Sequence, residues 1–508
     1  MARRKVIVVF VHGWGVTSTK SYGHLPDRLR ADAKNAGLNL VIHDVFLSKY
    51  ISFHDEVLLP DISRAFNNAV EEQLSEVLKR GRRFVCITHS TGGPVVRDWW
   101  QRYYGTVRRS GACPMSHLIM LAPANFGSAL AQLGKRRIGR LKSWFGGVEP
   151  GQGVLDWLEL GSDGIWALNT PWISSSGRQI GADGIFPFVL TGQSIDRAFY
   201  DHLNTYTGEA GSDGVVRVAG ANMNSNYLRL VQEKPQQRGD KRNGCEAPRL
   251  RLRKFETAPD TAFCILRGKS HSGPGMGIMR SIGKTAKDQA TVETIETILQ
   301  CMSVSSKAQY RSVVKDLAKC CVDRQSAERL EVDSRTFRMN AYFIHDRYSM
   351  VVFRLRDVEG HPVNDFDLVL TAGPGGNPDH LPKGFLADRQ LNSVSPNTIT
   401  FYFNYDLMVG SKKITDGDGR VIRAATRGAG ALGMRIWPRP DHGFVRYLPC
   451  EIRATRGLLE KALRPNCTTL VDIQLQRVVS KNVFRADKVD PGAPARSFKR
   501  TPPGEEIV

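Results

Sequence analysis

The sequence predicts an α/β domain built on a mostly parallel, doubly wound sheet, followed by a β-rich, sandwich-like domain. Residues 1 to about 302 alternate strand-like and helix-like stretches, which is typical of repeated βα units. The strand-like stretches are continuous apolar runs, as expected for strands that helices cover on both faces. After about residue 303, short strands alternate in polarity and are separated by Gly, Pro, Asn and Asp turns.

Six apolar runs are the expected strands of the parallel sheet: Val6–Val11, Leu38–Phe46, Arg83–Thr88, Ser116–Leu121, Phe186–Leu190 and Ala262–Arg267. Between them, Asp61–Arg80 repeats apolar residues every four positions, which predicts an amphipathic helix. A closing helix is expected over Ala290–Cys301, after the last strand.

The chain is long enough for two or three domains. We expect a catalytic domain over residues 1–302, with a lid insertion at about 127–180, an accessory domain over 303–485 and a disordered tail over 486–508. The accessory domain is expected to be an antiparallel sandwich. Its expected strands are Tyr348–Arg356, Asp365–Leu370, Thr398–Tyr405, Phe444–Ile452 and Thr468–Arg477.

The net charge of +21, from 71 Lys and Arg against 50 Asp and Glu, predicts affinity for a polyanion. An anionic membrane surface is the expected partner, and no nucleic acid is expected because no nucleic-acid-binding motif is present. Nine scattered cysteines and the absence of a zinc-ligand spacing predict free thiols and no metal or cofactor. The first apolar run is short for a signal peptide, so synthesis in the cytoplasm without one is expected.

A candidate nucleophile, Ser90, follows the third expected strand and precedes a helix that begins near Pro94. A serine hydroxyl needs an adjacent base, and a sharp strand-to-helix turn holds it clear of the backbone. Small residues on either side of the serine allow this turn. Gly92 fits that requirement, whereas Thr88 stands where the first glycine of the G-x-S-x-G pattern is expected.

The remaining parts of a hydrolase site follow in the order that such enzymes use. The segment around Trp14 follows the first strand, so the backbone N–H groups of Trp14 and Thr91 are the expected oxyanion hole. Asp213 is the expected acid and His271 the expected base. Two competing residues are the acid Asp196 and the base His202, although His202 precedes Asp213 and breaks the order.

Four segments together resemble the lipase branch of the α/β-hydrolases, in particular lipases similar to GPI inositol-deacylase and to lecithin:cholesterol acyltransferase. They are Val11–Gly15, Thr88–Gly93, Leu118–Ser128 and Ser212–Val216. The resemblance implies an α/β-hydrolase fold and cleavage of acyl esters over roughly residues 1–302. Thr88 and the pair Ala124-Asn125, where many such lipases have Pro-His, depart from the pattern.

A lipase-like domain joined to a β-rich domain is also similar to the lipase effectors of bacterial type VI secretion, and the segment Leu381–Asn392 contributes to this likeness. The likeness implies export by a system that reads no signal peptide, and a delivery or immunity protein as partner.

The expected lid contains a basic, aromatic stretch that suits an anionic lipid interface. The residues expected to contact the membrane are Lys135, Arg136, Arg137, Arg140, Lys142, Trp144 and Phe145. A solvated helix face without special function is the alternative.

The sequence thus predicts a serine lipase or phospholipase that acts on membrane lipids through a Ser-His-Asp triad, in the role of an antibacterial toxin. An acyltransferase or a general carboxylesterase would use the same acyl-enzyme. In another class, a non-catalytic basic protein on the same fold would bind membrane or nucleic acid. The oligomeric state and the lipid head group stay open.

Overall fold

The computed structural model describes most of the chain, and all structural statements below concern these residues. The described residues are 4–11, 19–45, 55–78, 81–105, 113–132, 151–196, 208–234, 248–333, 341–454, 456–480 and 491–492. None of the helices within these ranges is long and apolar enough to cross a membrane.

The first layer of the molecule is a six-stranded, fully parallel sheet in the order β2-β1-β3-β4-β5-β8. Its strands are β1 (Arg4–Val11), β2 (Leu38–Val45), β3 (Phe84–His89), β4 (Met115–Leu121), β5 (Phe186–Thr191) and β8 (Ala262–Ile265). All six coincide with the predicted apolar runs. The continuous burial of β3 and β5 explains why these runs lack alternation.

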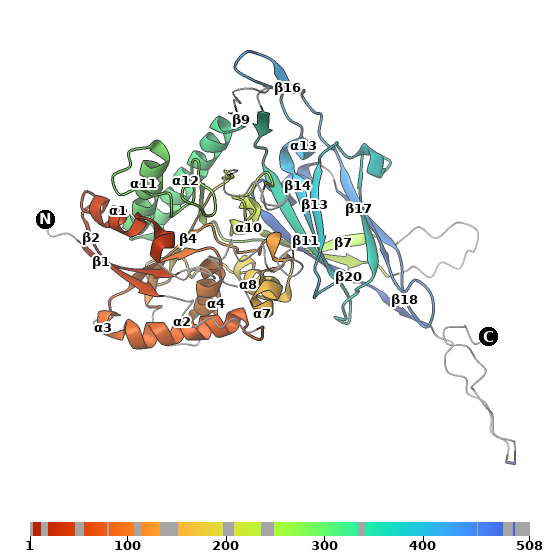
Figure 1. The fold of residues 1–508 in the computed structure, drawn as a ribbon. Coiled ribbons are helices and arrows are strands. Elements are labelled where there is room, and N and C mark those ends of the chain that lie inside the picture. Colours follow the sequence, from red (N-terminus) through yellow and green to blue (C-terminus); the bar gives the residue numbers. More distant parts are fainter. Residues whose placement is uncertain are drawn as a thin grey trace.

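Helices cover both faces of this sheet, as the doubly wound prediction requires (Figure 1). α1 (Leu25–Asp32) and α11 (Gln289–Ser303) pack together on one face, and α2 (Leu59–Gln73) and α4 (Gly92–Tyr104) pack together on the other. Between α2 and α4, the rings of Phe66 and Trp99 meet edge to face with centroids 5.1 Å apart. The mixed α/β architecture with a largely parallel sheet is therefore confirmed.

In the β-rich region two sheets enclose a second apolar core, and three two-stranded sheets lie beside them in the part of the chain that the structure describes. The larger sheet has the order β13-β14-β11-β20-β6-β7, and the smaller has the order β12-β17-β19. The strands of the larger sheet are β6 (Asn226–Gln232), β7 (Leu250–Thr257), β11 (Tyr348–Asp357), β13 (Leu386–Leu391), β14 (Thr398–Asn404) and β20 (Thr468–Leu475). Those of the smaller sheet are β12 (Phe366–Ala372), β17 (Leu432–Pro438) and β19 (Cys450–Ala454).

The larger sheet is mixed, so the expectation of a purely antiparallel sandwich was wrong. β20 runs parallel to both of its neighbours, β11 and β6. Parallel pairing needs a long crossover between strands, and here residues distant in sequence supply it. Nothing in the local pattern of either strand reveals this direction.

Two strands of the larger sheet, β6 and β7, come from the first 302 residues of the chain. In the other direction, α12 (Lys307–Ala327) packs against β8 of the parallel sheet, and the Tyr310 hydroxyl donates to the Pro187 carbonyl at 2.7 Å. The division at residue 302 stays a prediction, but strand pairing and helix packing both cross it.

The smaller elements complete the fold. They are η1 (Thr19–Tyr22), α3 (Ser75–Leu78), α7 (Gln152–Leu158), α8 (Asp163–Ile173), α10 (Val218–Ala221), η3 (Pro378–His380), α13 (Tyr405–Val409), α14 (Arg456–Ala462), β9 (Leu330–Asp333), β10 (Ala341–Ile344), β15 (Ile414–Thr415), β16 (Val421–Arg423), β18 (Val445–Tyr447) and β21 (Arg477–Val479). The cysteines in the described ranges are free thiols, as expected, and most are buried.

Candidate active site

Ser90 occupies a sharp turn between β3 and α4, where the sequence places it. Its φ of +54° lies in the left-handed region that non-glycine residues rarely adopt. The turn is fixed from both sides of the residue: the Ser90 N–H donates to the Leu121 carbonyl at 3.0 Å, and the Ser90 carbonyl accepts from the Gly93 N–H at 3.1 Å. Such strain at a strand-to-helix turn is typical of a nucleophile elbow.

The space behind the turn explains which small residues are needed. A Cβ on Gly93 would lie 2.7 Å from the Cβ of Pro123, so only glycine lets α4 approach the β4 side of the site. Thr88 instead sits inside β3, in register with Met120 of β4, and is buried. Its hydroxyl oxygen has no hydrogen-bond partner among the described residues. Threonine is therefore accommodated as a strand residue, at the cost of one unpaired hydroxyl.

A continuous hydrogen-bonded chain joins Ser90, His271 and Asp213. The Ser90 Oγ lies 3.0 Å from His271 Nε2, and His271 Nδ1 lies 3.0 Å from Asp213 Oδ2. The competing acid Asp196 does not occupy this position, because its Oδ2 faces Gly275 in the loop that follows His271. The competing base, His202, lies outside the described residues.

The carboxylate of Asp213 is fully buried and tightly held. Its Oδ1 accepts hydrogen bonds from the backbone N–H groups of Val215 at 3.0 Å and Val216 at 2.8 Å. The His271 N–H also donates to the Asp213 carbonyl at 2.8 Å, so the two residues are joined through backbone and side chain. This arrangement fixes which oxygen faces the imidazole and keeps the carboxylate oriented.

His89 is a site residue that the sequence analysis did not identify. Its Nε2 donates to the His271 carbonyl at 3.0 Å, and the two imidazole rings lie 4.8 Å apart. His89 thus ties the end of β3 to the loop that carries His271. The only signal in the sequence was its place next to Ser90.

The β-rich region contacts the loop that carries Asp213, which we call the acid loop, through a buried cluster of ion pairs. Arg217, four residues after Asp213, pairs with Glu209 through two hydrogen bonds of 2.8 Å and also with Asp388 of β13. Its guanidinium lies 4.2 Å from the ring centroid of Tyr402 of β14. Burial disfavours the charge of Arg217, but Glu209 and Asp388 outweigh it and raise its pKa. This cluster was also missed by the sequence analysis, because its members are far apart in the chain.

Tyr402 also fixes the start of the acid loop directly. Its hydroxyl donates to the Gly211 carbonyl at 2.9 Å. Gly211 has a φ of +74°, and a Cβ there would lie 2.4 Å from the Tyr402 hydroxyl oxygen. The loop that presents Asp213 is therefore built around a side chain of the C-terminal sheet.

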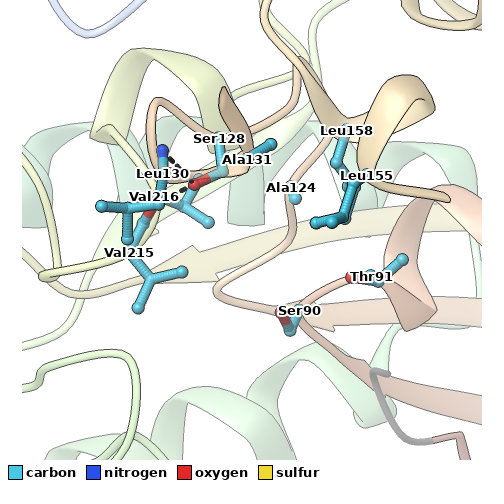
Figure 2. Close-up of a pocket in the computed structure, with 10 residues that line it drawn as sticks. All are labelled: Ser90, Thr91, Ala124, Ser128, Leu130, Ala131, Leu155, Leu158, Val215 and Val216. Carbon is cyan, nitrogen blue, oxygen red and sulfur yellow. Dashed lines mark hydrogen bonds between the residues drawn. The ribbon is translucent and has the colours of Figure 1, made fainter. Parts of the chain in front are cut away.

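A small pocket of about 20 Å³ lies beside Ser90, and its walls are mostly apolar (Figure 2). Its lining residues are Ser90, Thr91, Ala124, Ser128, Leu130, Ala131, Leu155, Leu158, Val215 and Val216. Thr91 is the N-cap of α4, and its backbone N–H has no acceptor among the described residues. That N–H is available for the expected oxyanion role. The second expected donor, Trp14, lies outside the described residues, as do all the expected lid contacts from Lys135 to Phe145.

Comparison with known proteins gives a strong likeness over nearly the whole chain. No protein-family model matches the chain, and no curated protein matches its sequence. Phospholipase PlaB from Legionella pneumophila, however, is 42% identical over 97% of this chain and 98% of its own, with a TM-score of 0.82. The chain belongs to the PlaB family. A second structure of PlaB, in complex with thio-NAD, is 41% identical over 99% of this chain and 100% of its own, with the same TM-score.

Membership of the PlaB family makes the chain a carboxylic ester hydrolase, as the sequence predicted, and argues against the non-catalytic alternative. The mature lipase BlEst2 of Bacillus licheniformis is 18% identical over 44% of this chain and 80% of its own, with a TM-score of 0.32. That likeness is too remote to carry an argument. The expected branch of lipases similar to GPI inositol-deacylase stays a prediction.

Proposed function

We propose that this chain is a serine phospholipase that hydrolyses acyl esters of membrane phospholipids. The observation that carries the proposal is the hydrogen-bonded chain from Asp213 through His271 to Ser90, at a strained elbow, in a relative of a phospholipase. In this proposal Ser90 is the nucleophile, His271 the general base and Asp213 the residue that orients the base.

The acylation step follows from this geometry. Ser90 Oγ attacks the ester carbonyl carbon while His271 Nε2, 3.0 Å away, takes the hydroxyl proton. The oxyanion that forms accepts a hydrogen bond from the Thr91 N–H and, in this proposal, from the Trp14 N–H. When the tetrahedral intermediate collapses, the carbon–oxygen bond to the glycerol breaks and His271 gives its proton to the leaving alkoxide.

Deacylation uses the same groups in the reverse sense. His271 removes a proton from a water molecule, whose oxygen attacks the acyl-serine carbonyl. Collapse of the second intermediate releases a fatty acid and returns the proton to Ser90 Oγ. Throughout, the two backbone donors on Asp213 Oδ1 leave Oδ2 for the imidazole, which stabilises the imidazolium in each transition state.

The pocket and the charge of the chain favour a lipid substrate. The walls beside Ser90 are formed by residues such as Leu130, Leu155 and Leu158, which suit an acyl chain rather than a polar acyl group. The net charge of +21 favours an anionic membrane surface. We propose that Lys135, Arg140 and Trp144, with their neighbours in the predicted lid, make that contact.

An acyltransferase would share every step up to the acyl-enzyme and differ only in the acceptor. A general carboxylesterase would differ in favouring soluble short-chain esters. Both alternatives are separated from a phospholipase by the products that they form from a bilayer.

The test is product analysis on liposomes of phosphatidylcholine and phosphatidylglycerol, with wild type and Ser90→Ala. We expect wild type to release fatty acid and lysophospholipid, and the Ser90→Ala protein to release neither. Equal release by both proteins would overturn the proposal. Transfer of the acyl group to an added long-chain alcohol in place of release would favour an acyltransferase, and activity confined to short-chain esters would favour a carboxylesterase.

Delivery to the membranes of rival cells, with a delivery or immunity protein as partner, is a further proposal that rests on the resemblance to type VI lipase effectors. It predicts that the protein appears in the culture medium of its host and that the medium loses it when the secretion system is deleted. If the protein stays inside the cells of both the parent strain and the deletion strain, this proposal is contradicted.

A dinucleotide is a ligand that we propose from the relative alone, since PlaB has a structure with thio-NAD. We expect NAD to raise the thermal unfolding temperature of this chain in a saturable way. An unchanged unfolding temperature with NAD in large excess would contradict this proposal and leave the hydrolase proposal untouched.

A further inference from the structure

Arg97 of α4 is a buried cation for which the proposed reaction gives no role. It lies seven residues after Ser90 in the chain and is only 2% exposed. Its guanidinium forms no ion pair with a carboxylate among the residues that the structure describes. Burial lowers its pKa to about 9, because water no longer solvates the charge. A buried charge without a counter-charge is costly, and natural proteins retain such departures from ordinary packing mainly at functional sites.

Two buried asparagines hold the guanidinium in place of a carboxylate. Arg97 donates from Nη1 to Asn125 Oδ1 and from Nη2 to Asn169 Oδ1, both at 3.0 Å. A guanidinium can only donate hydrogen bonds, so it fixes the orientation of both amides and directs each Nδ2 towards a carbonyl. The Nδ2 of Asn169 donates to the backbone carbonyls of Asn125 and Ile165, each at 2.9 Å. Asn125 is therefore held through its side chain and through its backbone.

The Nδ2 of Asn125 connects this cluster to the acid loop. It donates to the Ala221 carbonyl of α10 at 2.7 Å. The first residue of α10, Val218, donates its N–H to the Gly211 carbonyl at 2.8 Å, at the start of the acid loop. The buried guanidinium on the helix that follows the nucleophile is thus linked, through a single amide and α10, to the loop that presents Asp213.

The loop after β4, which carries this amide, also contacts the elbow. Its Ala124 lines the pocket beside Ser90, and the Ala124 N–H donates to the Ser90 carbonyl at 3.4 Å. Its first residue, Ala122, has a φ of +48°, a left-handed conformation that a non-glycine residue keeps only when its surroundings impose it. The Phe126 N–H adds a second bond to α10, at 2.9 Å to the Gly220 carbonyl. The loop is thus a strained bridge between the elbow and α10.

We propose that Arg97 and Asn125 are positioning residues, which hold the nucleophile elbow and the acid loop in the register that the triad needs. The inference rests on the proposed function for the roles of Ser90, His271 and Asp213. Neither Arg97 nor Asn125 lines the pocket, so their loss should change the alignment of the triad and not the binding of substrate. A misplacement of about 1 Å can cost roughly a hundredfold in rate. We therefore expect kcat to fall while KM stays constant.

The test is the Asn125→Asp protein, assayed on dihexanoylphosphatidylcholine below its micellar concentration, a phospholipid that needs no bilayer contact. The new carboxylate still accepts from Arg97, now as an ion pair, but an oxygen replaces the Nδ2 donor that faces the Ala221 carbonyl. We expect kcat to fall between roughly tenfold and a hundredfold with KM unchanged. The protein should still unfold cooperatively, because the ion pair offsets part of the lost hydrogen bond.

Asn67→Asp is the matched control. Asn67 of α2 is a buried amide that accepts from Trp99 of α4 at 3.1 Å, so the same substitution is made against the same helix but away from α10. This variant should keep the kcat of wild type.

Arg97→Lys tests the guanidinium itself and leaves both asparagines unchanged. Lysine keeps the charge but lacks the planar fork that bonds two amides at once, so kcat should fall in this protein as well. The double variant with Asn125→Asp should lose no more than the larger of the two single losses, because both substitutions act through one contact. Arg97→Lys decides the proposal alone if Asn125→Asp does not fold.

Several results would overturn the proposal. An unchanged kcat in Asn125→Asp, or an equal loss in Asn67→Asp, would remove the link to α10. A wild-type kcat in Arg97→Lys would mean that charge alone suffices, and a rise of KM without a fall of kcat would place the residues in substrate binding.

The proposed function fails separately from this inference. If wild type hydrolyses no phospholipid, the rate at which Ser90 reacts with an alkyl fluorophosphonate still reports the alignment of the triad. Slower labelling in Asn125→Asp than in Asn67→Asp would then support the positioning role, and equal rates would overturn it.

Discussion

The two halves of the proposed active site are built in different ways. The nucleophile half uses contacts within β3, β4 and α4, and the bonds that fix Ser90 come from Gly93, Leu121 and Ala124. The acid half depends on distant parts of the chain, because Asp388 and Tyr402 of the β-rich region hold the loop around Asp213. The serine is thus set by the hydrolase fold, whereas the acid is set jointly with the second region.

This difference indicates what the β-rich region does for the site. A separate accessory domain would leave the acid loop intact when removed or loosened. Here the loop is anchored by an arginine that is buried between two carboxylates, one of them on β13, and by a tyrosine hydroxyl from β14. Substitutions that distort the larger sheet should therefore displace Asp213 and, with it, His271.

The largest expected effect is the loss of the acid itself. Asp213→Asn should lower kcat on phospholipid by roughly 10⁴-fold, because the amide favours the wrong tautomer of His271. Steady-state hydrolysis of liposomes measures it. Asp196→Asn is the matched control and should retain activity; an equal loss in both variants would mean that Asp213 has no special role.

The second largest expected effect is a loss of stability, and it compares the buried ion pairs of Arg217 with an exposed ion pair on β7. Arg217→Met leaves Glu209 and Asp388 buried without their cation and should lower the free energy of unfolding by about 3 to 5 kcal/mol. Chemical denaturation measures it. Arg251→Met, which breaks the exposed pair with Glu233, should cost less than about 1 kcal/mol. Similar losses in the two variants would contradict the buried anchor.

Acid pH should weaken the parallel sheet through His117 of β4. Burial lowers the pKa of His117 to about 4, and its Nε2 donates to the Val304 carbonyl at 2.8 Å. Since the unfolded imidazole has a pKa of about 6.5, the unfolded chain takes up the proton first as pH falls. The stabilisation that comes from the neutral His117 is fully present above a pH of about 6.5 and is lost progressively as the pH falls towards 4. Between about pH 7 and pH 4.5, wild type should lose roughly 2 to 3 kcal/mol more stability than His117→Gln. If the free energy of unfolding varies with pH in the same way in wild type and in His117→Gln, this prediction is refuted.

The smallest expected effect probes the link from β14 to the acid loop. Tyr402→Phe removes one hydrogen bond to the Gly211 carbonyl, worth about 1 kcal/mol. If part of this hydrogen-bond energy stabilises the transition state and not the bound substrate, kcat should fall a few-fold while KM stays constant. Tyr342→Phe on β10 removes a hydroxyl contact to Asp416, which follows β15, and should leave kcat unchanged. A larger loss in Tyr342→Phe than in Tyr402→Phe would contradict the link.

The sequence predicted what short-range patterns control. The six buried strands are continuous apolar runs, and the elbow around Ser90, the Asp213 turn and the His271 loop follow one another in a known order, so their meeting in space could be anticipated. The pairing of β6 with β20 could not, because strand pairing over more than 200 residues leaves no local signal. The same reason hid Arg217, whose carboxylate partner Asp388 is 171 residues away.

The most direct test of the central claim is covalent labelling of the active serine with an alkyl fluorophosphonate, followed by mass spectrometry of the peptides. An activated serine displaces the fluoride and keeps the phosphonate. We predict a single adduct on Ser90 in wild type, none in Ser90→Ala, and far slower labelling in His271→Ala. An adduct on another serine, or labelling of Ser90 at the same rate without His271, would contradict the triad.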